Sequence, residues 1–391
     1  MSSDARSRLA TGWLTMFVIG SDLFVVSPLL PQIAASFAVA AATAGLCVTV
    51  FALVYMAGAP LLGHIGDRVG RRRILVCCLG VFAIANLLTA VAGSFAWLLG
   101  ARLLAGAAAA GVSPSVYALA GGSAPFGRRG THLAIVVSGL LASLTLAAPC
   151  AALIGPKIGW PAVFAGIAAL GLLLAWANLR VWPAPGGSAG VEAPPGRLAI
   201  GALAPRLAPT VVWSTALYGT YTYLGTGLGL AGYATGPIAG VILLYGCGAM
   251  VGILLGGRIT DRFGERFATT TALASLSGCF LLLQLALHAR VLVGCVFWLM
   301  SAVAQVFFPA QQAGLARDFP GRRTTVLAWN NSALFLGISL GSLIGGRAVA
   351  FGGFAADLAV SAVIAIIGCA VNALVVASPA YLAREAADRQ A

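Results

Sequence analysis

Long apolar runs recur along almost the whole 391-residue chain, and they restrict its possible folds more than any other feature. A helix needs roughly 20 consecutive apolar residues to cross ~30 Å of hydrocarbon, and these runs reach that length. Apolar residues make up 60% of the chain, and its mean hydropathy is +0.98. Backbone groups in lipid must be satisfied within a helix or a closed barrel. Because ten-residue strands of alternating polarity are absent, the sequence predicts an all-α membrane protein.

The apolar runs predict twelve transmembrane spans, with boundaries good to a few residues. These lie near residues 13–37, 43–63, 74–93, 96–120, 132–155, 160–182, 207–230, 235–257, 268–287, 291–315, 325–346 and 355–377. The first run is much longer than the roughly 7–15 apolar residues of a signal peptide, so we expect it to be retained as a span.

Basic residues outnumber acidic ones by 23 to 10, and their placement explains the excess. With twelve spans and the N-terminus inside, 19 arginines fall in inner loops and tails, whereas the outer loops hold only Lys157, Arg290 and Arg347. This asymmetry follows the positive-inside rule, so we expect both termini to be cytoplasmic. The charge therefore reflects topology in a lipid bilayer and argues against nucleic acid as a partner. The expected location is a bacterial-type inner membrane.

One charged cluster occurs twice, half a chain apart. The stretch "GHIGDRVGRRRIL" begins at Gly63, and "GGRITDRFGERF" repeats its Gly, Asp and Arg register 194 positions later. A Pro/Gly-rich stretch separates the two copies near the middle of the chain. The sequence thus predicts an N-terminal six-helix bundle over 1–182, a cytoplasmic linker over 183–206 and a C-terminal six-helix bundle over 207–391. Two equivalent halves suit alternating access around a site at the midplane.

Small residues at four-residue spacing predict close helix packing in lipid. Equivalent positions of the fifth span in each half carry them, and the eighth span has a similar stripe. The three sets are Ser143, Ala147 and Ala151; Gly337, Gly341 and Gly345; and Gly248, Gly252 and Gly256.

Several of these segments resemble motifs of the major facilitator superfamily. "GHIGDRVGRRRIL" is similar to its signature between helices 2 and 3, and "RLLAGAAAAG" from Arg102 is similar to its fourth-helix motif. "GSDLFVVSPLLPQIA" resembles the first helix of the drug:proton antiporter branch, which includes drug and sugar efflux proteins. "AAPCAALIG" matches the fifth-helix motif only in part, since alanines stand where glycines are expected around Pro149. The resemblance covers the whole chain.

This resemblance implies a twelve-helix fold in two pseudo-symmetric bundles, with helices 1, 4, 7 and 10 around a central cavity. It implies a monomeric transporter of small molecules, coupled to protons, with no cofactor. The leading hypothesis is a proton-coupled exporter of small lipophilic or modestly polar compounds. A symporter that imports a nutrient is the alternative, and a membrane sensor or intramembrane enzyme is a third.

The repeated cluster suggests a conformational latch on the seam between the halves. Asp67 can face the positive end of the helix dipole near Thr324 and Thr325, at the start of the eleventh span. Gly63 and Gly70 would permit a tight turn and a close approach. The alternative is that the arginines only anchor the topology. The latch residues are Gly63, Asp67, Arg68, Gly70, Arg71 and Arg72.

Asp22 is the carboxylate expected nearest the midplane, about nine residues or ~14 Å into the first span. Such a group costs roughly 2.5–3.5 kcal/mol to insert, so it normally faces a cavity and serves function. Arg102 is the only intramembrane cation, and its side chain can reach towards Asp22 or extend outwards to the membrane surface. We expect Asp22 to carry the coupling proton and Arg102 to tune it. A purely structural ion pair remains the alternative.

The faces of the fourth, seventh and tenth spans predict an aromatic, weakly polar and nearly uncharged cavity lining. Two glutamines on an otherwise aromatic stripe need polar partners, which favours a wet cavity. The predicted lining is Tyr117, Tyr218, Tyr221, Trp298, Gln305, Phe308 and Gln312.

Metal and catalytic sites are not predicted. The three histidines are dispersed, and the eight cysteines lie scattered in apolar runs without a CxxC pair, as small buried hydrophobic residues do. No Ser/His/Asp set, paired carboxylates or nucleotide-binding loop is found, so we expect the protein not to be an enzyme and not to use ATP.

Overall fold

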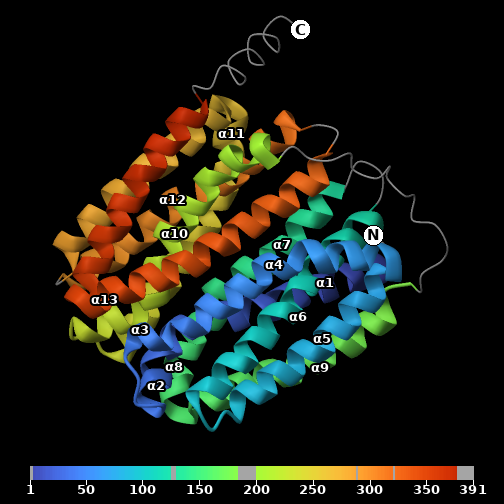
Figure 1. Ribbon diagram of the computed structural model, residues 1–391, viewed down its shortest axis with the longest axis horizontal. Helices are drawn as coiled ribbons and strands as arrows, with labels where there is room; N and C mark the ends of the chain where they lie inside the picture. The colour runs from blue at the N-terminus through green and yellow to red at the C-terminus, as the bar shows by residue number, and fades with distance from the viewer. Residues whose placement is uncertain (1–2, 125–128, 184–199, 288, 320–321, 377–391) are drawn as a thin grey trace, which may run out of the picture.

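The computed structural model describes residues 3–124, 129–183, 200–287, 289–319 and 322–376, which fold into thirteen α-helices (Figure 1). Nine precede the middle of the chain: α1 (Ser3–Phe24), α2 (Val26–Ser36), α3 (Ala41–Ala44), α4 (Leu46–Val69), α5 (Arg71–Ala90), α6 (Phe95–Gly122), α7 (Arg129–Thr145), α8 (Ala147–Ile158) and α9 (Trp160–Val181). Four longer ones follow: α10 (Ile200–Leu230), α11 (Thr235–Ala286), α12 (Arg290–Asp318) and α13 (Arg323–Val376).

These helices form the twelve predicted spans. The pairs α1–α2, α3–α4 and α7–α8 each make one span, and the first of these pairs is bent by 44°. Helices α11 and α13 each hold two spans, because their backbones leave helical geometry at Gly264 and at Gly352 and Gly353. The all-α, twelve-helix prediction is confirmed.

The boundaries near the middle of the chain differ from those expected. Helix α10 begins at Ile200, so residues 200–206 of the predicted linker are helical. Residues 184–199 of that linker lie outside the described part of the chain, as do four arginines assigned to the inner side: Arg128, Arg197, Arg384 and Arg389.

The helices gather into two bundles that lie side by side, blue to green and yellow to red in Figure 1. In the first, α5 packs on α6 and α9, and α1 on α7. In the second, α11 packs on α12, and α10 on α13. The bundles meet where α13 contacts α3 and α4, where α10 contacts α2, and where α11 contacts α7 and α8.

Every described residue with positive φ has an equivalent in the other half. Gly70 (φ 105°) and Gly264 (φ 83°) end the second span of their halves, and Gly159 (φ 81°) and Gly353 (φ 70°) precede the sixth. Ala38 (φ 50°) pairs in the same way with Gly232 (φ 81°). The members of each pair are 194 positions apart, the offset of the charged repeat. The two halves are therefore equivalent in the backbone conformation of their turns as well as in sequence.

The small-residue faces lie at close helix contacts. A Cβ at Gly341 would lie 2.5 Å from the Thr215 carbonyl oxygen of α10, and one at Gly256 would lie 2.8 Å from the Pro309 ring of α12. In the first half, Ser143 of α7 fills the space beside Gly20 of α1. These contacts are the close backbone approaches expected of small residues in lipid.

We call the end of the molecule formed by residues 63–73 and 257–266 the arginine-rich end. The opposite end holds the turns at Ala38, Gly159, Gly232 and Gly353. Consecutive spans run in opposite directions between these two ends, so the position of a residue along its span gives its distance from the arginine-rich end.

Candidate functional site

Asp22 and Arg102 form an ion pair inside the first bundle. Arg102 Nη1 lies 2.6 Å from Asp22 Oδ1, and Nη2 donates to the Asp22 carbonyl at 3.3 Å. The side chains are 0% and 1% exposed, respectively. Removing each ion from water costs several kcal/mol. A sealed ion pair is therefore stable only if the two opposite charges lie in close contact.

Side chains from three other helices of the same half surround this pair. The guanidinium lies 4.8 Å from the ring centre of Phe51 on α4 and 5.4 Å from that of Phe164 on α9. Asn86 of α5 lies beside the carboxylate. Asp22 Oδ2 and Arg102 Nε have no hydrogen-bond partner within the described residues. In this conformation the pair is therefore enclosed in the first bundle, and its second carboxylate oxygen is left unpaired.

The glycines that follow Arg102 explain how α6 reaches this position. A side chain at Gly106 would run into the carbonyl of Phe51, and one at Gly111 would lie 2.5 Å from Cys78 Sγ of α5. Close packing of α6 against α4 and α5 thus depends on the missing side chains. It carries Arg102 into the core, where Asp22 is the acidic partner.

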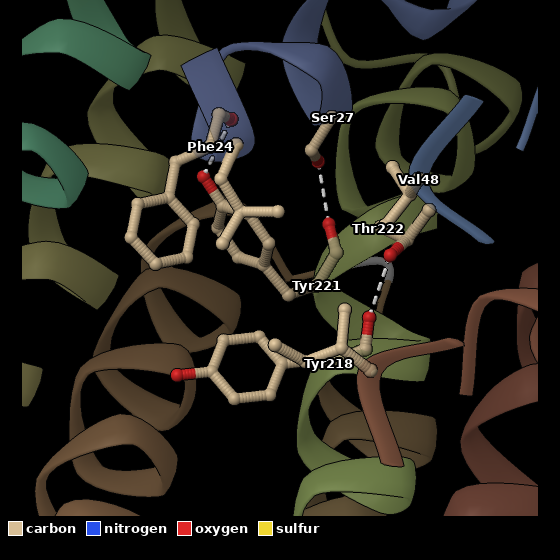
Figure 2. Close-up of a pocket in the computed structure, with 8 residues that line it drawn as sticks. Phe24, Ser27, Val48, Tyr218, Tyr221 and Thr222 are labelled. Carbon is tan, nitrogen blue, oxygen red and sulfur yellow. Dashed lines mark hydrogen bonds between the residues drawn. The ribbon is translucent and has the colours of Figure 1, made fainter. Parts of the chain in front are cut away.

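One turn beyond Asp22, the first span meets the second half at two freed carbonyls. Pro28 and Pro31 lack the N–H groups that would bond the carbonyls of Phe24 and Ser27. The Tyr221 hydroxyl of α10 donates to the Phe24 carbonyl at 3.0 Å, and Ser27 Oγ donates to the Tyr221 carbonyl at 2.5 Å (Figure 2). The Ser27 carbonyl faces Gly225, where a Cβ would lie 2.9 Å away. The bend of the first span therefore forms part of the seam.

A small cavity of about 10 Å³ lies at this contact, lined by both halves. Figure 2 shows Tyr218 and Tyr221 reaching it from α10, with Phe24 and Ser27 above them from the first span. The volume is about that of one water probe, so the site is closed to larger molecules in this conformation. The lining contains no ionisable carboxylate or cation: Leu23, Phe24, Ser27, Val48, Tyr218, Tyr221, Thr222 and Ile338.

An aromatic cluster continues from this cavity into the second bundle. Trp213 of α10 stacks on Phe308 at 5.9 Å between ring centres and on Phe307 at 5.1 Å. Tyr221 lies 5.1 Å from Tyr245 of α11. The cluster places aromatic faces from three helices beside the seam.

The predicted lining residues only partly come together. Tyr218 and Tyr221 line the cavity, Gln305 is buried beside Tyr218, and Phe308 joins the aromatic cluster. Tyr117 lies beside Tyr55, nearer the arginine-rich end, and Gln312 is half-buried. Trp298 is 36% exposed, so its side chain is not enclosed in this cluster.

The seam between α4 and α13 is closed by contacts that run from the end opposite the arginines to about the middle of the two helices. Ser342 Oγ donates to the Gly45 carbonyl at 2.8 Å, and Ser339 Oγ to the Thr49 carbonyl at 3.1 Å. Further along, the rings of Tyr55 and Phe335 stack. These hydrogen bonds hold the halves together on the side away from the arginines.

At the arginine-rich end, the predicted latch residues form local contacts. Asp67 pairs with Arg71 one turn later, at 2.5 Å, and Arg72 donates to the Leu179 carbonyl of α9. Gly70 makes the tight turn between α4 and α5 that was expected of it. The close approach expected at Gly63 occurs at Gly66, where a Cβ would lie 3.2 Å from Arg71.

Within the described part of the chain, the remaining latch residues make no hydrogen bond or ion pair across the seam. Arg68 is exposed. A Cβ at Gly63 would meet only Arg71 Nη1, at an ordinary 3.9 Å. The side chain of Thr324, one of the expected partners of Asp67, lies outside the described residues.

Three cysteines depart from the expected burial. Cys77, Cys150 and Cys295 are exposed on the surface of the bundles. All eight cysteines are free thiols. In the described part of the chain, no group of three or more His, Cys, Asp or Glu side chains is arranged to hold a metal ion.

The family is decided by comparison of the whole chain with known proteins. The sequence model described as Major Facilitator Superfamily matches residues 12–283 and 214–390. An uncharacterized MFS-type transporter of Bacillus subtilis (strain 168), YbcL, is 30% identical over 85% of this chain and 86% of its own length. The chain belongs to the major facilitator superfamily. It is thus a multi-pass membrane protein of a family of small-molecule transporters.

The chain is also similar to one further relative in sequence and to two solved structures in fold. A chloramphenicol resistance protein of Streptomyces lividans is 27% identical over 83% of this chain and 85% of that protein. The fold is similar to that of a bacterial homologue of the human lysosomal transporter Spinster in an inward-facing, occupied conformation, with a TM-score of 0.78, 17% identity and coverage of 96% and 97%. A D-xylose–proton symporter gives the same TM-score at 16% identity, with coverage of 95% and 97%.

Proposed function

We propose that this superfamily member is a proton-coupled exporter of small lipophilic or modestly polar compounds, working by alternating access in a bacterial-type inner membrane. The observation that carries the proposal is the buried Asp22–Arg102 pair, one turn from the contact between the halves. Intramembrane ion pairs are costly to insert and mark proton or substrate pathways in transporters.

Proton uptake at Asp22 would change the balance of charge in the first bundle. A protonated carboxyl no longer neutralises Arg102, and an unpaired buried cation is unfavourable by several kcal/mol. The first span must then move, or the guanidinium must reach water. Because Phe24 and Ser27 follow Asp22 within about one turn, such a movement would pull on their hydrogen bonds to Tyr221. Protonation of Asp22 would in this way change the balance between the closed and the open seam.

The lining of the seam supports an apolar cargo. The residues around the small cavity and the aromatic cluster supply ring faces, hydroxyls and the Gln305 amide, and none of them carries a full charge. A sugar phosphate or dicarboxylate would need several cations. The relative from Streptomyces lividans, whose name states chloramphenicol resistance, supports efflux of such a compound.

We also propose that the arginine-rich end faces the cytoplasm, with both termini on that side, as the positive-inside rule requires. The described hydrogen bonds across α4 and α13 then close the outer side of the seam. Asp67, Arg68, Arg71 and Arg72 would form the inner latch in the alternate state, when the cytoplasmic side closes. The expected units over 1–182 and 207–391 would move as the two rocking bodies of a monomer.

Import by symport is the second candidate. The fifth-helix segment "AAPCAALIG" lacks the glycines of the antiporter motif. A proton symporter for a sugar has the same fold, although at 16% identity this likeness carries no information on direction.

Proteoliposomes with an imposed pH gradient test the proposal. Export predicts that adding chloramphenicol or a neutral lipophilic dye causes proton movement opposite to the cargo, and that Asp22→Asn abolishes it. Asp4→Asn, which removes the same charge at an exposed carboxylate in the first turn of α1, serves as a charge-matched control that retains the proton flux. Proton and cargo moving in the same direction would establish symport instead. Substrate-driven proton movement that survives in Asp22→Asn would overturn the assignment of the coupling residue.

A further inference from the structure

A second carboxylate is sealed inside the other half of the molecule. Asp357 of α13 is 0% exposed, and neither of its carboxylate oxygens has a hydrogen-bond partner within the described residues. Asp357 lies about one turn after the break at Gly352 and Gly353. The sequence alone therefore places it at the start of a span and does not predict its burial. In the structure it is buried between the seventh, eleventh and twelfth spans.

The groups around Asp357 supply no counter-charge. A Cβ at Gly345 would lie 2.7 Å from Asp357 Oδ1, so backbone packs against the carboxylate on that side. Thr220 of α10 lies beside it, but the Thr220 hydroxyl already donates to Ser361 Oγ at 2.9 Å. The titratable group that faces it from α10 is Tyr223.

Charged side chains on the neighbouring segments do not reach Asp357. Cys47 of α4 lies beyond Tyr223. Arg347, two residues after Gly345, is exposed on the bundle surface and forms no described ion pair with Asp357. The start of the twelfth span contributes only the partial positive charge of a helix end. A buried carboxylate in such surroundings is strongly disfavoured as an anion.

The same residues connect Asp357 to the seam. Tyr223, its neighbour, donates to the Ser342 carbonyl at 2.8 Å, and Ser342 Oγ donates across the seam to the Gly45 carbonyl at 2.8 Å. Gly345 and Gly346 are in the same turn of α13, and a side chain at Gly346 would run into the Tyr223 hydroxyl. Any change that lets water reach Asp357 must therefore loosen this part of the closed seam.

We infer that Asp357 is a second proton-binding group, on the second half, and that its protonated form keeps the opposite end of the seam closed. The proton comes from water admitted when the seam opens and adds to one carboxylate oxygen. The inference rests on the proposed alternating access but not on the role of Asp22. A proton is favoured over sodium because sodium needs several oxygen ligands, and the Thr220 and Ser361 hydroxyls are already bonded to each other.

Distance measurements on the full chain in lipid nanodiscs test this inference. Spin labels at Ala40 and Thr235, exposed sites on opposite halves, report opening in a variant free of other cysteines. We expect the distance to increase from acidic to alkaline pH. Asp357→Asn should keep the short distance at every pH, because asparagine mimics the protonated carboxyl. Ser361→Ala, which alters the same site without a titratable group, should retain the pH response.

Four outcomes would overturn the inference: no pH response in the parent protein, a normal response in Asp357→Asn, a response that follows sodium concentration at constant pH, or a response lost in Ser361→Ala as well. The measurement in Asp22→Asn separates the two proposals. If only Asp22→Asn loses the response, the coupling role of Asp22 stands and that of Asp357 fails.

Chemical labelling covers the case in which Asp357→Asn does not fold. Dicyclohexylcarbodiimide reacts with protonated carboxyls in apolar surroundings. In the unsubstituted protein we expect mass spectrometry to find the adduct on Asp357 at acidic pH and its loss at alkaline pH. Absence of the adduct at both values would overturn the inference.

Discussion

Ser27 and Tyr221 occupy equivalent positions in the two halves, 194 residues apart, and are joined by a hydrogen bond of 2.5 Å. In a molecule with two-fold pseudo-symmetry, a residue can contact its own equivalent only close to the axis that relates the halves. The first and seventh spans therefore meet at this axis.

The Tyr221 hydroxyl is predicted to stabilise the closed seam. Tyr221→Phe leaves the Phe24 carbonyl buried without its donor, at a cost of about 1–3 kcal/mol. Cys47 is 1% exposed and lies near Tyr223 at the seam. Kept as the sole cysteine, it should react several-fold faster with a membrane-permeant maleimide in Tyr221→Phe.

Tyr233→Phe is the matched control for that measurement. The Tyr233 hydroxyl donates to the Leu287 carbonyl within the second half, so its removal should leave the Cys47 labelling rate unchanged. Equal labelling rates in both variants and the parent would show that Tyr221 does not hold the seam.

The Asp22–Arg102 pair should behave as a single energetic unit. Removing one partner of a buried pair typically costs about 3–5 kcal/mol, because the other charge is left uncompensated. We therefore expect Asp22→Asn and Arg102→Gln each to lower the unfolding temperature in detergent strongly, and the double variant to lower it by less than the sum. Arg71→Gln breaks the partly exposed Asp67–Arg71 pair, one turn apart on the surface, and should cost only about 0.3–0.5 kcal/mol. Additive effects at Asp22 and Arg102 would contradict the pairing.

Substitutions at the equivalent turns of Ala38 and Gly232 are predicted to change the stability of the protein in opposite directions. Both have positive φ, and no atom lies within 4 Å of a Cβ at Gly232, so only backbone strain opposes a side chain there. Gly232→Ala should destabilise the protein by roughly 1–2 kcal/mol. Ala38→Gly relieves the same strain and should raise the unfolding temperature. Gly229→Ala is the control, since Gly229 is helical with open space around it; a loss at Gly229 equal to that at Gly232 would rule out strain as the cause.

Gly106 is predicted to position Arg102. An alanine Cβ would lie 2.9 Å from the Phe51 Cα, so Gly106→Ala must push α6 away from α4. Overpacking of this kind costs typically about 1–3 kcal/mol. We expect lower thermal stability and a shifted pH dependence of transport. Gly100→Ala, on the same helix with open space around it, should be neutral or up to about 1 kcal/mol stabilising. Unchanged transport and stability in Gly106→Ala would contradict the proposed positioning role.

The architecture was predictable because lipid leaves few alternatives. Apolar runs long enough to cross a bilayer must become helices, and the repeated charged cluster divides them into equal halves. The proximity of Asp22 and Arg102 was also open to prediction, since two opposite charges in so apolar a core need each other. The enclosure of the pair within the first bundle was not, because helical periodicity does not say which neighbour a face meets.

The seam and Asp357 needed the structure for a related reason. The contacts of Ser27, Gly45 and Ser342 use backbone carbonyls, which have no sequence signature apart from the prolines that free two of them. The offset of 194 residues makes Ser27 and Tyr221 equivalent, but equivalence alone does not say which equivalent residues lie close enough to the axis to touch. Asp357 looks like a residue at a helix end because the burial around it comes from α10 and the preceding span.

Helix α10 is the exception among the long helices. It does not reach the apolarity that marks its neighbours as spans, yet residues 213–228 are buried throughout. Some of its polar side chains bond to other helices, as where Thr210 donates to Asn330 and Thr220 to Ser361, and others bond to carbonyls of α10 itself, as Thr222 does to Tyr218. Such a segment gains little from entering lipid alone. We therefore expect the insertion of α10 to depend on the helices that follow it, and the second half to be complete only once α13 has been made.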